Sequence, residues 1–405
     1  MADRSAPRPA RGRTSLFWLS ISAVIYGSVG FPVLVALRAL ARPRPIRSAP
    51  ITPTVSVLVA AHNEAAVIAA KLDNLAATDY PADAIEVVVA SDGSTDATVG
   101  IATHHGSEPR VLDLPRRGKN HALNDAVAHA SGSIIVVSDA DSTLERGALR
   151  ALAAYFADPE VGGVAGNFRY RRSDRGGDGE RAYWNFDRVV KRLQTRSGSA
   201  TSSTGQLHAL RRELWSPLPG GVADDSYESL GVVAQGYRLV YADDAIASGD
   251  VEVDDAREYD RKVRYITRGL RSVWLRRELL DPRRHGWYAL QLLSHKVLRR
   301  LVAVPMVVLA VVSPTLWRRG RWYRAATATQ LLAHGLALVA WLRPPSSAKG
   351  LGGLVRRFGR IALYVDLTNL AVLRSIWGLW REPPRDVWTP QRGDRVVGES
   401  EIGIR

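Results

Sequence analysis

Two carboxylates one residue apart, Asp139 and Asp141, are the side chains of this sequence that most directly suggest chemistry. They follow residues 134–137, four β-branched residues that predict a strand buried on both faces. In open α/β sheets, ligands bind beyond the carboxyl ends of the strands. Carboxylates at that place suit Mg²⁺ or Mn²⁺, which would bridge to substrate phosphates. Ordinary turn chemistry produces the same Asp-x-Asp pattern, so the pair alone leaves both interpretations open.

Polar turns also follow two earlier predicted strands. Residues 55–61 predict a first buried strand, which ends at His-Asn-Glu, and residues 86–90 predict a second, which ends before Asp-Gly-Ser. A helical composition follows the first strand, so the pattern predicts a parallel α/β sheet. Neither turn contains Gly-x-Gly-x-x-Gly, and Gly-Lys-Asn at 118–120 lacks the rest of a P-loop. If the chain binds a nucleotide, it must do so through residues other than a dinucleotide-binding glycine motif or a P-loop.

Four short motifs occur in a characteristic order. They are Ala-His-Asn-Glu at 61–64, Asp-Gly-Ser at 92–94, Gly-Lys-Asn at 118–120 and Asp-Ala-Asp at 139–141. In this order and spacing the chain resembles glycosyltransferase family 2, and the likeness runs on through residues 203–212 and 223–226. The resemblance covers roughly residues 54–271. It implies the α/β fold called GT-A, a mostly parallel sheet flanked by helices; the hydropathy pattern adds transmembrane helices at the N-terminus and C-terminus.

The resemblance implies a donor site. Glu64 and Asp92 match family positions that hold the uridine end of a UDP-sugar, while Asp139 and Asp141 match the metal and diphosphate carboxylates. Lys119 would lie along the donor phosphates. Two ordinary alternatives stay open at this point. Asp92 suits a local turn or helix cap, and Lys119 suits a solvated position.

The second half of the resemblance supplies the acceptor side and a base. Acceptor contacts in the family fall around Ser203, Thr204 and Gly205, although a plain turn would also use such residues. Asp225 matches the position that deprotonates the acceptor hydroxyl, and we assign Asp224 to helix capping or metal support. The family mechanism is direct displacement with inversion.

A basic amphipathic helix is predicted over residues 256–280. It suits either the membrane surface or a position packed on the catalytic domain. Polysaccharide-synthase members of the family carry Gln-x-x-Arg-Trp here, whereas residues 261–265 are Arg-Lys-Val-Arg-Tyr, which match the arginine alone. Arg264 would still contact the donor diphosphate. The replaced tryptophan puts processive synthesis in doubt.

Four apolar stretches could cross a membrane. Residues 16–37 carry no charge and contain Pro32, which would kink a helix; a cleaved signal peptide is the alternative. Residues 301–317 and 325–342 are apolar, and 358–380 is a further span interrupted by ionisable residues. Arginines lie on both sides of the first span, so charge does not orient it. Nucleotide sugars are cytosolic, so we expect a multi-pass protein of the cell membrane with a cytosolic catalytic domain.

Composition and hydropathy indicate how the 405 residues are divided into domains and membrane segments. Lys and Arg total 55 against 40 Asp and Glu, a net charge of +15 that suits anionic partners, and the absence of cysteine excludes disulfides and thiolate metal sites. We predict a basic tail at 1–14, a transmembrane helix at 15–40, a GT-A catalytic domain at 50–250, basic interfacial helices at 251–296, a C-terminal membrane region of two to three helices at 297–380, and a tail at 381–405.

The family resemblance, together with the apolar spans, implies a membrane glycosyltransferase of the hexosyltransferase type. We expect metal-dependent, inverting transfer from a UDP-linked donor to a saccharide or lipid-linked acceptor at the membrane, for cell-envelope or extracellular polysaccharide synthesis. The alternatives are a membrane nucleotidyltransferase and a non-catalytic sugar-binding membrane protein. The first usually has a Gly-rich loop after its first strand, where this chain has His-Asn-Glu. The arginines cluster beside apolar spans, which argues against a nucleic-acid partner.

Overall fold

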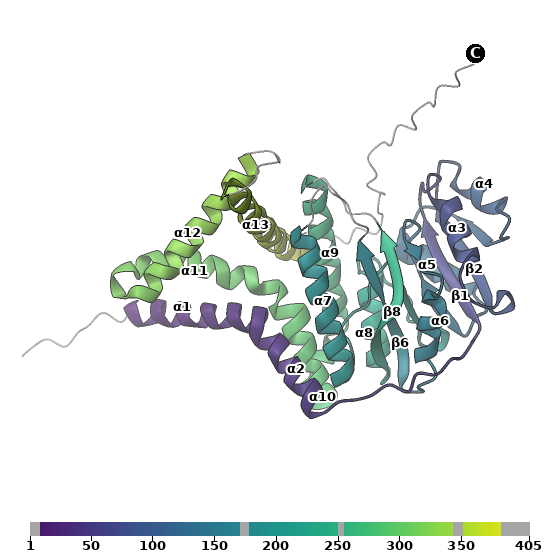
Figure 1. The fold of residues 1–405 in the computed structure, drawn as a ribbon, viewed down its shortest axis with the longest axis horizontal. Helices are drawn as coiled ribbons and strands as arrows, with labels where there is room; N and C mark the ends of the chain where they lie inside the picture. Colours follow the sequence, from purple (N-terminus) through teal and green to yellow (C-terminus); the bar gives the residue numbers. More distant parts are fainter. Residues whose placement is uncertain (1–8, 171–177, 250–254, 343–350, 382–405) are drawn as a thin grey trace, which may run out of the picture.

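A computed structural model of the chain describes residues 9–170, 178–249, 255–342 and 351–381. Most of the two predicted tails, residues 1–8 and 382–405, therefore lies outside the described residues. Figure 1 shows a sheet covered by helices beside a group of longer helices. The sheet part contains the motifs of the sequence analysis.

An eight-stranded mixed sheet forms the centre of the catalytic part. Its strands are β1 (Val55–Ala61), β2 (Ile85–Asp92), β3 (Arg110–Leu114), β4 (Ile134–Val137), β5 (Thr143–Leu144), β6 (Val161–Tyr170), β7 (His208–Arg211) and β8 (Arg238–Gly249). They are arranged in the order β3-β2-β1-β4-β7-β6-β8-β5. The pairs β1–β2, β1–β4, β2–β3 and β6–β8 are parallel, while β7 is antiparallel to both β4 and β6. The predicted mixed α/β fold is confirmed.

Helices cover both faces of this sheet, which explains why whole strands are apolar. They are α3 (Ile68–Ala76), α4 (Thr98–Thr103), α5 (Lys119–Ala128), α6 (Ala148–Tyr155), α7 (Asp178–Ser197) and α8 (Asp224–Ala234). Along β1, Val57 and Val59 belong to a buried cluster with Leu72 of α3, whereas Leu58 belongs to another with Leu123 of α5. Successive side chains of a strand point to opposite faces, so both faces need apolar residues.

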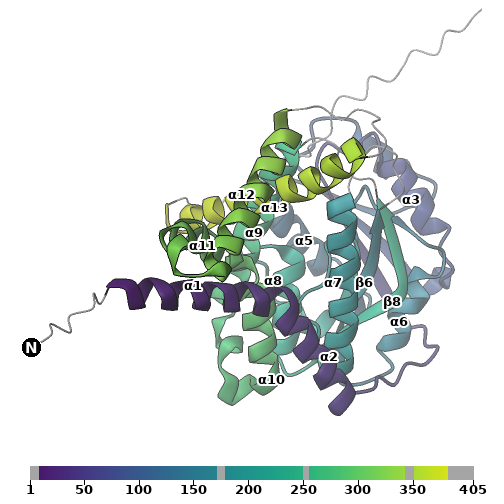
Figure 2. The same cartoon turned by 60° about the vertical axis from the view of Figure 1, so that its left-hand side comes forward.

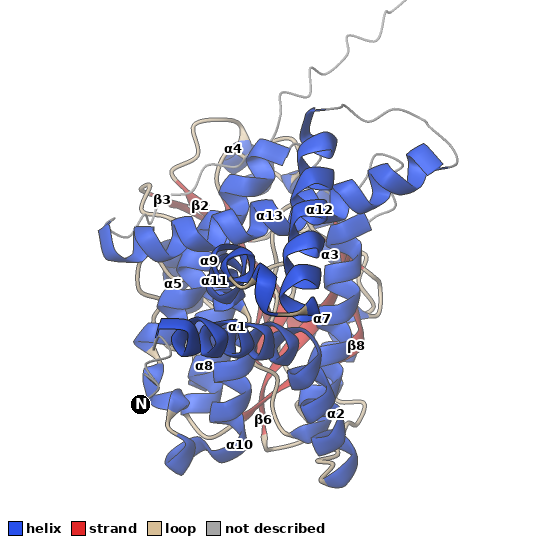
Figure 3. Ribbon diagram, turned by 90° about the vertical axis from the view of Figure 1, so that its left-hand side faces the viewer, coloured by secondary structure: helices blue, strands red, loops and turns tan. Residues whose placement is uncertain are grey.

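The remaining helices form the second part of the molecule (Figure 3). They are α1 (Pro9–Ile25), α2 (Phe31–Ala41), α9 (Asp255–Leu275), α10 (Pro282–Leu292), α11 (Ala303–Thr315), α12 (Arg321–Leu342) and α13 (Leu351–Arg381). A π-helical turn, Tyr26–Gly30, joins α1 to α2, and Figure 2 shows the change of direction there. Pro32 at the start of α2 cannot donate a backbone hydrogen bond and its ring clashes with the preceding turn, so it explains this local rearrangement.

Fewer helices qualify as membrane spans than the sequence analysis expected. By length and hydropathy, Arg11–Ala41 and Arg321–Leu342 qualify within the described chain. The pair Pro282–Leu298 and Arg300–Thr315, bent by 43°, would make a third if it is one span. The helix α13 does not qualify, because its charged residues lower its hydropathy. These two or three candidates are fewer than the three to four spans expected, and the number of helices that cross a membrane remains a prediction.

The amphipathic helix α9 packs against protein. Its Ile266 lies in a buried cluster with Ala371 and Val372 of α13, and its Val273 lies with Leu230 of α8. Part of its apolar face is thus covered by neighbouring helices. The sequence left two positions open for this helix, the membrane surface and the surface of the catalytic domain. The contacts of Ile266 and Val273 are explained by packing on the rest of the chain.

Candidate active site

The predicted site residues gather at one edge of the sheet. The strands β1, β2 and β4 are parallel neighbours, so the turns that follow them meet at the same edge. These turns carry Glu64, Asp92 and the Asp139/Asp141 pair. The strand order changes direction between β1 and β4, which is where open α/β sheets form a binding crevice.

The turns after β1 and β2 are tied together by hydrogen bonds. The Asn63 Oδ1 atom accepts from the backbone N–H of Thr95 at 2.8 Å, and the backbone N–H of Glu64 donates to Thr98 Oγ1 at 2.8 Å. Asn63 has a positive φ of 53°, which asparagine tolerates better than most residues. The two turns therefore form one supported surface, on which Glu64 is buried.

Asp92 supports the loop that precedes α5. Its carboxylate accepts from the backbone N–H groups of Arg117 at 2.7 Å and Gly118 at 2.9 Å, and the residue is 1% exposed. Gly118 has a φ of 101°, so the loop needs glycine there. The Asp92 carboxylate thus positions the loop that leads to Lys119. Its predicted contact with the donor base remains a proposal.

Lys119 connects the end of β4 to the start of α8. Its Nζ lies 2.8 Å from Asp139 Oδ1 and 2.9 Å from Asp224 Oδ2, and its side chain is 18% exposed. Burial alone would lower the pKa of this amine, but the two carboxylates outweigh it and raise the pKa. Lys119 is therefore an ion-paired residue of the site, and not the solvated lysine that the sequence also allowed.

The Asp139/Asp141 pair lies beside Gly205. A Cβ added at Gly205 would lie 3.6 Å from Asp139 Oδ2 and 3.9 Å from Lys119 Nζ, so the glycine leaves space against the carboxylate. Burial raises the pKa of Asp139, and Asp141 and Asp224 raise it further against the opposing effect of Lys119. The segment predicted to hold the acceptor therefore lies against the predicted metal carboxylate.

The carboxylate pair fits a divalent cation of the Mg²⁺ type. Within the described chain, no group of three or more His, Cys, Asp and Glu side chains could hold a metal. Such a cage is not needed, because Mg²⁺ is commonly held by one or two carboxylates together with substrate phosphates and water. Asp141 is exposed and Asp139 is partly exposed, so both can be reached from solvent.

Asp225 lies on the other side of the same segment. The Ser203 Oγ donates to the backbone oxygen of Asp225 at 3.0 Å, and the Asp225 Oδ1 accepts from the N–H of Ser226 at 2.7 Å. Ala223 is the N-cap of α8 and makes no side-chain capping bond. Asp224 is therefore not the N-cap, and its side chain pairs with Lys119; the metal support that was the other role expected of it remains a proposal.

The two adjacent aspartates have opposite pKa shifts. Burial raises the pKa of Asp225, and the neighbouring Asp224 charge raises it further. Burial would also raise the pKa of Asp224, but the ion pair with Lys119 outweighs it and lowers the pKa. Environments that separate two neighbouring carboxyl groups in this way are typical of acid–base sites. Asp225 is the stronger proton acceptor of the two.

Comparison with known proteins identifies the domain. Residues 56–216 match the sequence model of Glycosyl transferase family 2. The chain carries a glycosyltransferase family 2 domain. The matched region runs from β1 to just beyond β7 and includes both the Asp139/Asp141 pair and the 203–205 segment.

Several curated relatives share part of this domain. The chain is 34% identical over 163 residues to a beta-monoglucosyldiacylglycerol synthase of Synechocystis sp., covering 36% of this chain and 34% of the relative. It is 28% identical over 261 residues to an N-acetylglucosaminyltransferase of Rhizobium meliloti, covering 58% of this chain and 60% of the relative. The chain thus spans between about a third and three fifths of these relatives.

A solved structure resembles the chain over more of its length. It is a mannosyltransferase from Pyrobaculum calidifontis in complex with GDP-mannose and Mn²⁺, 27% identical, with a TM-score of 0.66. The likeness covers 89% of this chain and 99% of that one. Because 89% reaches well beyond the sheet, the shared fold includes the helical part. The fold of the family 2 domain is GT-A.

Arg264 is a predicted site residue for which the structure shows no direct contact with the carboxylates and lysine of this site. It lies on α9, and no hydrogen bond or ion pair joins it to Asp139, Lys119 or Asp224 among the described residues. Burial lowers its pKa, and the neighbouring arginines 261 and 268 lower it further. Its contact with the donor diphosphate remains a proposal.

The sequence analysis missed Lys71, which lies behind the metal pair. This lysine of α3 is 2% exposed, and its Nζ donates to Ser138 Oγ at 2.7 Å and to the Ser142 backbone oxygen at 2.9 Å. Burial lowers its pKa to about 7, although Asp139 and Asp141 oppose the shift. Lys71 lies on the apolar face of a helix predicted from the sequence, and this unusual position could have identified it as a residue of interest.

A buried histidine supports the acceptor segment and was also missed. His208 Nδ1–H donates to the Thr204 backbone oxygen at 3.0 Å, and His208 Nε2 lies 2.5 Å from Glu228 Oε2 of α8. Burial would lower the pKa of His208, but Glu228 outweighs it and raises the pKa. This pair fixes the segment relative to the helix that begins with Asp224 and Asp225.

The same segment is also joined to the helical part. Lys296 Nζ donates to Ser202 Oγ at 2.5 Å, and Thr201 Oγ1 lies 2.8 Å from His295 Nδ1. Next to them, Ser294 Oγ lies 2.7 Å from the hydroxyl of Tyr26 in the N-terminal span. The predicted acceptor segment is therefore connected to the apolar helices through buried polar contacts.

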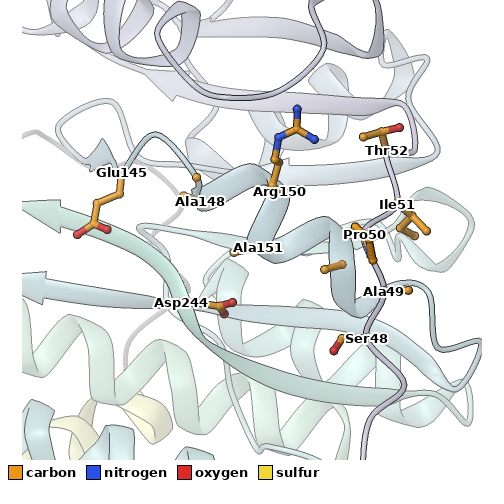
Figure 4. A pocket seen from close by; sticks show the side chains of 12 residues that line it. Ser48, Ala49, Pro50, Ile51, Thr52, Glu145, Ala148, Arg150, Ala151 and Asp244 are labelled. Carbon is orange, nitrogen blue, oxygen red and sulfur yellow. The ribbon is translucent and has the colours of Figure 1, made fainter.

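A pocket of about 540 Å³ lies away from these residues (Figure 4). It is formed between residues 48–52 and α6, with Glu145, Arg150 and Asp244 at its edges. None of the predicted site residues lines it. We assign it no part in the chemistry.

Proposed function

We propose that this chain is a membrane-bound glycosyltransferase that moves a sugar from a nucleotide sugar to a saccharide or lipid-linked acceptor. The observation that carries the proposal is the double ion pair of Lys119 with Asp139 and Asp224. It joins Asp139 of the predicted metal pair to Asp224, the residue before the predicted base at the start of α8. This arrangement supports group transfer better than sugar binding alone.

Asp139 and Asp141 would hold the divalent cation. When bound, Mg²⁺ or Mn²⁺ supplies positive charge that stabilises the departing diphosphate. The similar Pyrobaculum mannosyltransferase contains Mn²⁺, which supports a requirement for a divalent cation here. Lys119, now paired with Asp139, would lie close to the same phosphates.

Asp225 would act as the general base. A sugar hydroxyl is a weak nucleophile, and a positioned carboxylate that takes its proton contributes about 10²–10⁴-fold to the rate. The hydroxyl oxygen then forms a bond to the anomeric carbon, while the bond to the diphosphate breaks on the opposite face. One displacement of this kind inverts the anomeric configuration. The raised pKa of Asp225 suits this role, because the base must accept a proton near neutral pH.

The donor is a nucleotide sugar, and we propose a UDP-sugar from the family positions of Glu64 and Asp92. A donor panel must also contain GDP-mannose, because the similar mannosyltransferase is in complex with it. Glu64 is buried beside the β1–β2 turns and Asp92 fixes the neighbouring loop, so both lie where a nucleoside would contact the domain.

The acceptor is proposed to lie at the membrane surface. One relative is named for the synthesis of beta-monoglucosyldiacylglycerol, a glycolipid. The buried contacts from residues 201–202 to the apolar helices support an acceptor presented from that side. A multi-pass protein of the cell membrane with a cytosolic catalytic domain, working in envelope or extracellular polysaccharide synthesis, is the setting that we propose.

A donor panel tests this function. Purified full-length protein in detergent is offered UDP- and GDP-sugars with Mn²⁺ or Mg²⁺ and a lipid extract, and released nucleotides are separated by chromatography. We expect release of a nucleoside diphosphate together with a glycosylated product. Pyrophosphate release would instead favour a nucleotidyltransferase, and binding without any release would favour a non-catalytic protein.

A further inference from the structure

A second pocket lies at the opposite edge of the sheet from the family 2 site. It has a volume of about 640 Å³ and is lined by residues of α2 and α10 and by the segments that precede β6 and β8. The strand β7 is antiparallel to both β4 and β6, and β8 is parallel to β6, so β6 and β8 run in the direction of β4. Their starts therefore lie at the edge away from Asp139. This pocket is separate from the site of chemistry.

Cationic side chains dominate the lining of this pocket. Arg38, Arg44, Arg238 and Arg284 contribute to it, whereas Glu160 is the single acidic residue among the lining residues. Glu160 lies 2.9 Å from Arg44 and 3.5 Å from Arg238. Arg238 also donates to backbone oxygens, including that of Gly198 at 3.0 Å. Arg284 makes one long ion pair, 3.8 Å from Asp281 Oδ2 at the surface, so Arg38 and Arg284 are the cations that a ligand could engage.

Two buried polar groups of the pocket lack hydrogen-bond partners. They are the Nε of Arg38 and the hydroxyl of Tyr288, and neither has a partner among the residues that the structure describes. Tyr288 is 8% exposed, and the Arg38 guanidinium lies 5.3 Å from the centre of the Trp287 ring. Buried polar groups in folded proteins are normally satisfied. Both groups can donate, but the two atoms are almost inaccessible, so ligand oxygens would satisfy them only after the Arg38 and Tyr288 side chains turn toward the pocket.

The place of Arg38 indicates the source of such a ligand. It lies in the last turn of α2, at the end of the apolar stretch Arg11–Ala41, which is long enough to cross a membrane. The apolar neighbours Leu37 and Leu40 are exposed on the same helix. The end of a span lies at the level of the lipid head groups, where arginines bind phosphates.

We propose that this pocket binds the phosphate of an anionic membrane lipid. Arg38 and Arg284 contact the phosphate oxygens, and the acyl chains lie along the exposed apolar face of α2. The lipid would hold the catalytic domain at a fixed position relative to the membrane surface. The proposal requires the N-terminal span but not the transfer reaction, so its test uses stability and not activity.

The test measures the thermal unfolding midpoint of full-length protein in detergent micelles. The probes are dioctanoyl phosphatidylglycerol, dioctanoyl phosphatidylcholine and inorganic phosphate. We expect phosphatidylglycerol to raise the midpoint saturably and more than phosphatidylcholine does. Arg38→Gln and Arg284→Gln should each raise the half-saturating lipid concentration about tenfold, the usual effect of losing a hydrogen bond to a charged group. Arg283→Gln is the matched control, because it is exposed on the same helix but does not line the pocket.

Three outcomes would overturn the proposal. The first is an unchanged midpoint with phosphatidylglycerol, and the second is an equal response of wild type, Arg38→Gln and Arg284→Gln. The third is an equal, Arg38-dependent rise with inorganic phosphate, which would assign the pocket to a soluble anion. If Arg38→Gln fails to fold, Arg284→Gln decides the question, since that side chain is 76% exposed and its replacement leaves the core intact.

Discussion

At the residue scale, the proposed mechanism requires Asp225, and not its neighbour Asp224, to take the proton of the acceptor hydroxyl. Asp225→Asn keeps the size of the side chain but cannot accept a proton, so transfer should fall by about 10²–10⁴-fold while donor binding is retained. Asp224→Asn should keep most of the activity. It should cost about 1–3 kcal/mol of unfolding free energy, because Lys119 loses a charged partner. Transfer assays and nucleotide titrations on both variants check this; an inactive Asp224→Asn beside an active Asp225→Asn would reverse the assignment.

The raised pKa of Asp225 gives a second prediction, on stability. A carboxyl whose pKa is higher in the folded than in the unfolded state favours folding at low pH, and that contribution is lost as the pH rises through the folded pKa. Asp225→Asn should therefore unfold at a higher denaturant concentration than wild type at pH 7. The difference should vanish at a pH below the ordinary aspartate range. Equal stability of the two proteins at pH 7 would show that Asp225 is not destabilised by its charge.

At the element scale, α3 should hold the metal-binding turn through Lys71. Lys71→Met removes the bonds to Ser138 and Ser142 that flank the carboxylate pair, so the turn should loosen. We expect the half-saturating Mn²⁺ concentration to rise about tenfold, the cost of one or two hydrogen bonds to a charged group. Arg150→Met, which removes an exposed cation nearby, is the control. An unchanged Mn²⁺ dependence in Lys71→Met would show that the amine serves packing alone.

The elements differ in how well the sequence predicted them. The strands β1 and β4 were predicted because a run of mostly apolar, Val- and Ile-rich residues indicates burial on both faces. The pairing of Lys119 with Asp224 could not be found, since it joins residues 105 positions apart and depends on how α8 meets β4. Lys71 and His208 were missed for the same reason: each acts through the three-dimensional neighbours of a single polar side chain.

At the scale of the whole molecule, the N-terminal span is part of the folded structure. Phe31 and Val35 of α2 form a buried cluster with Val190 of α7, and Tyr26 contacts Ser294. We therefore predict that the mature protein retains residues 16–37, as intact mass and amino-terminal sequencing would show. A mature chain that begins near residue 42 would support the signal-peptide alternative. The helix α13 is the predicted span that does not qualify by hydropathy, because it combines apolar residues with several charges, and it packs on α9.

A Mn²⁺ titration shows whether the Asp139/Asp141 pair supports metal-dependent sugar transfer. Label transferred from the preferred nucleotide sugar to product is measured for wild type and Asp141→Asn, with an EDTA-treated sample as the zero point. We predict saturable, Mn²⁺-dependent transfer by wild type and almost none by Asp141→Asn, whose fold and membrane insertion should be unchanged. Full transfer by Asp141→Asn, or by wild type in excess EDTA, would contradict the account.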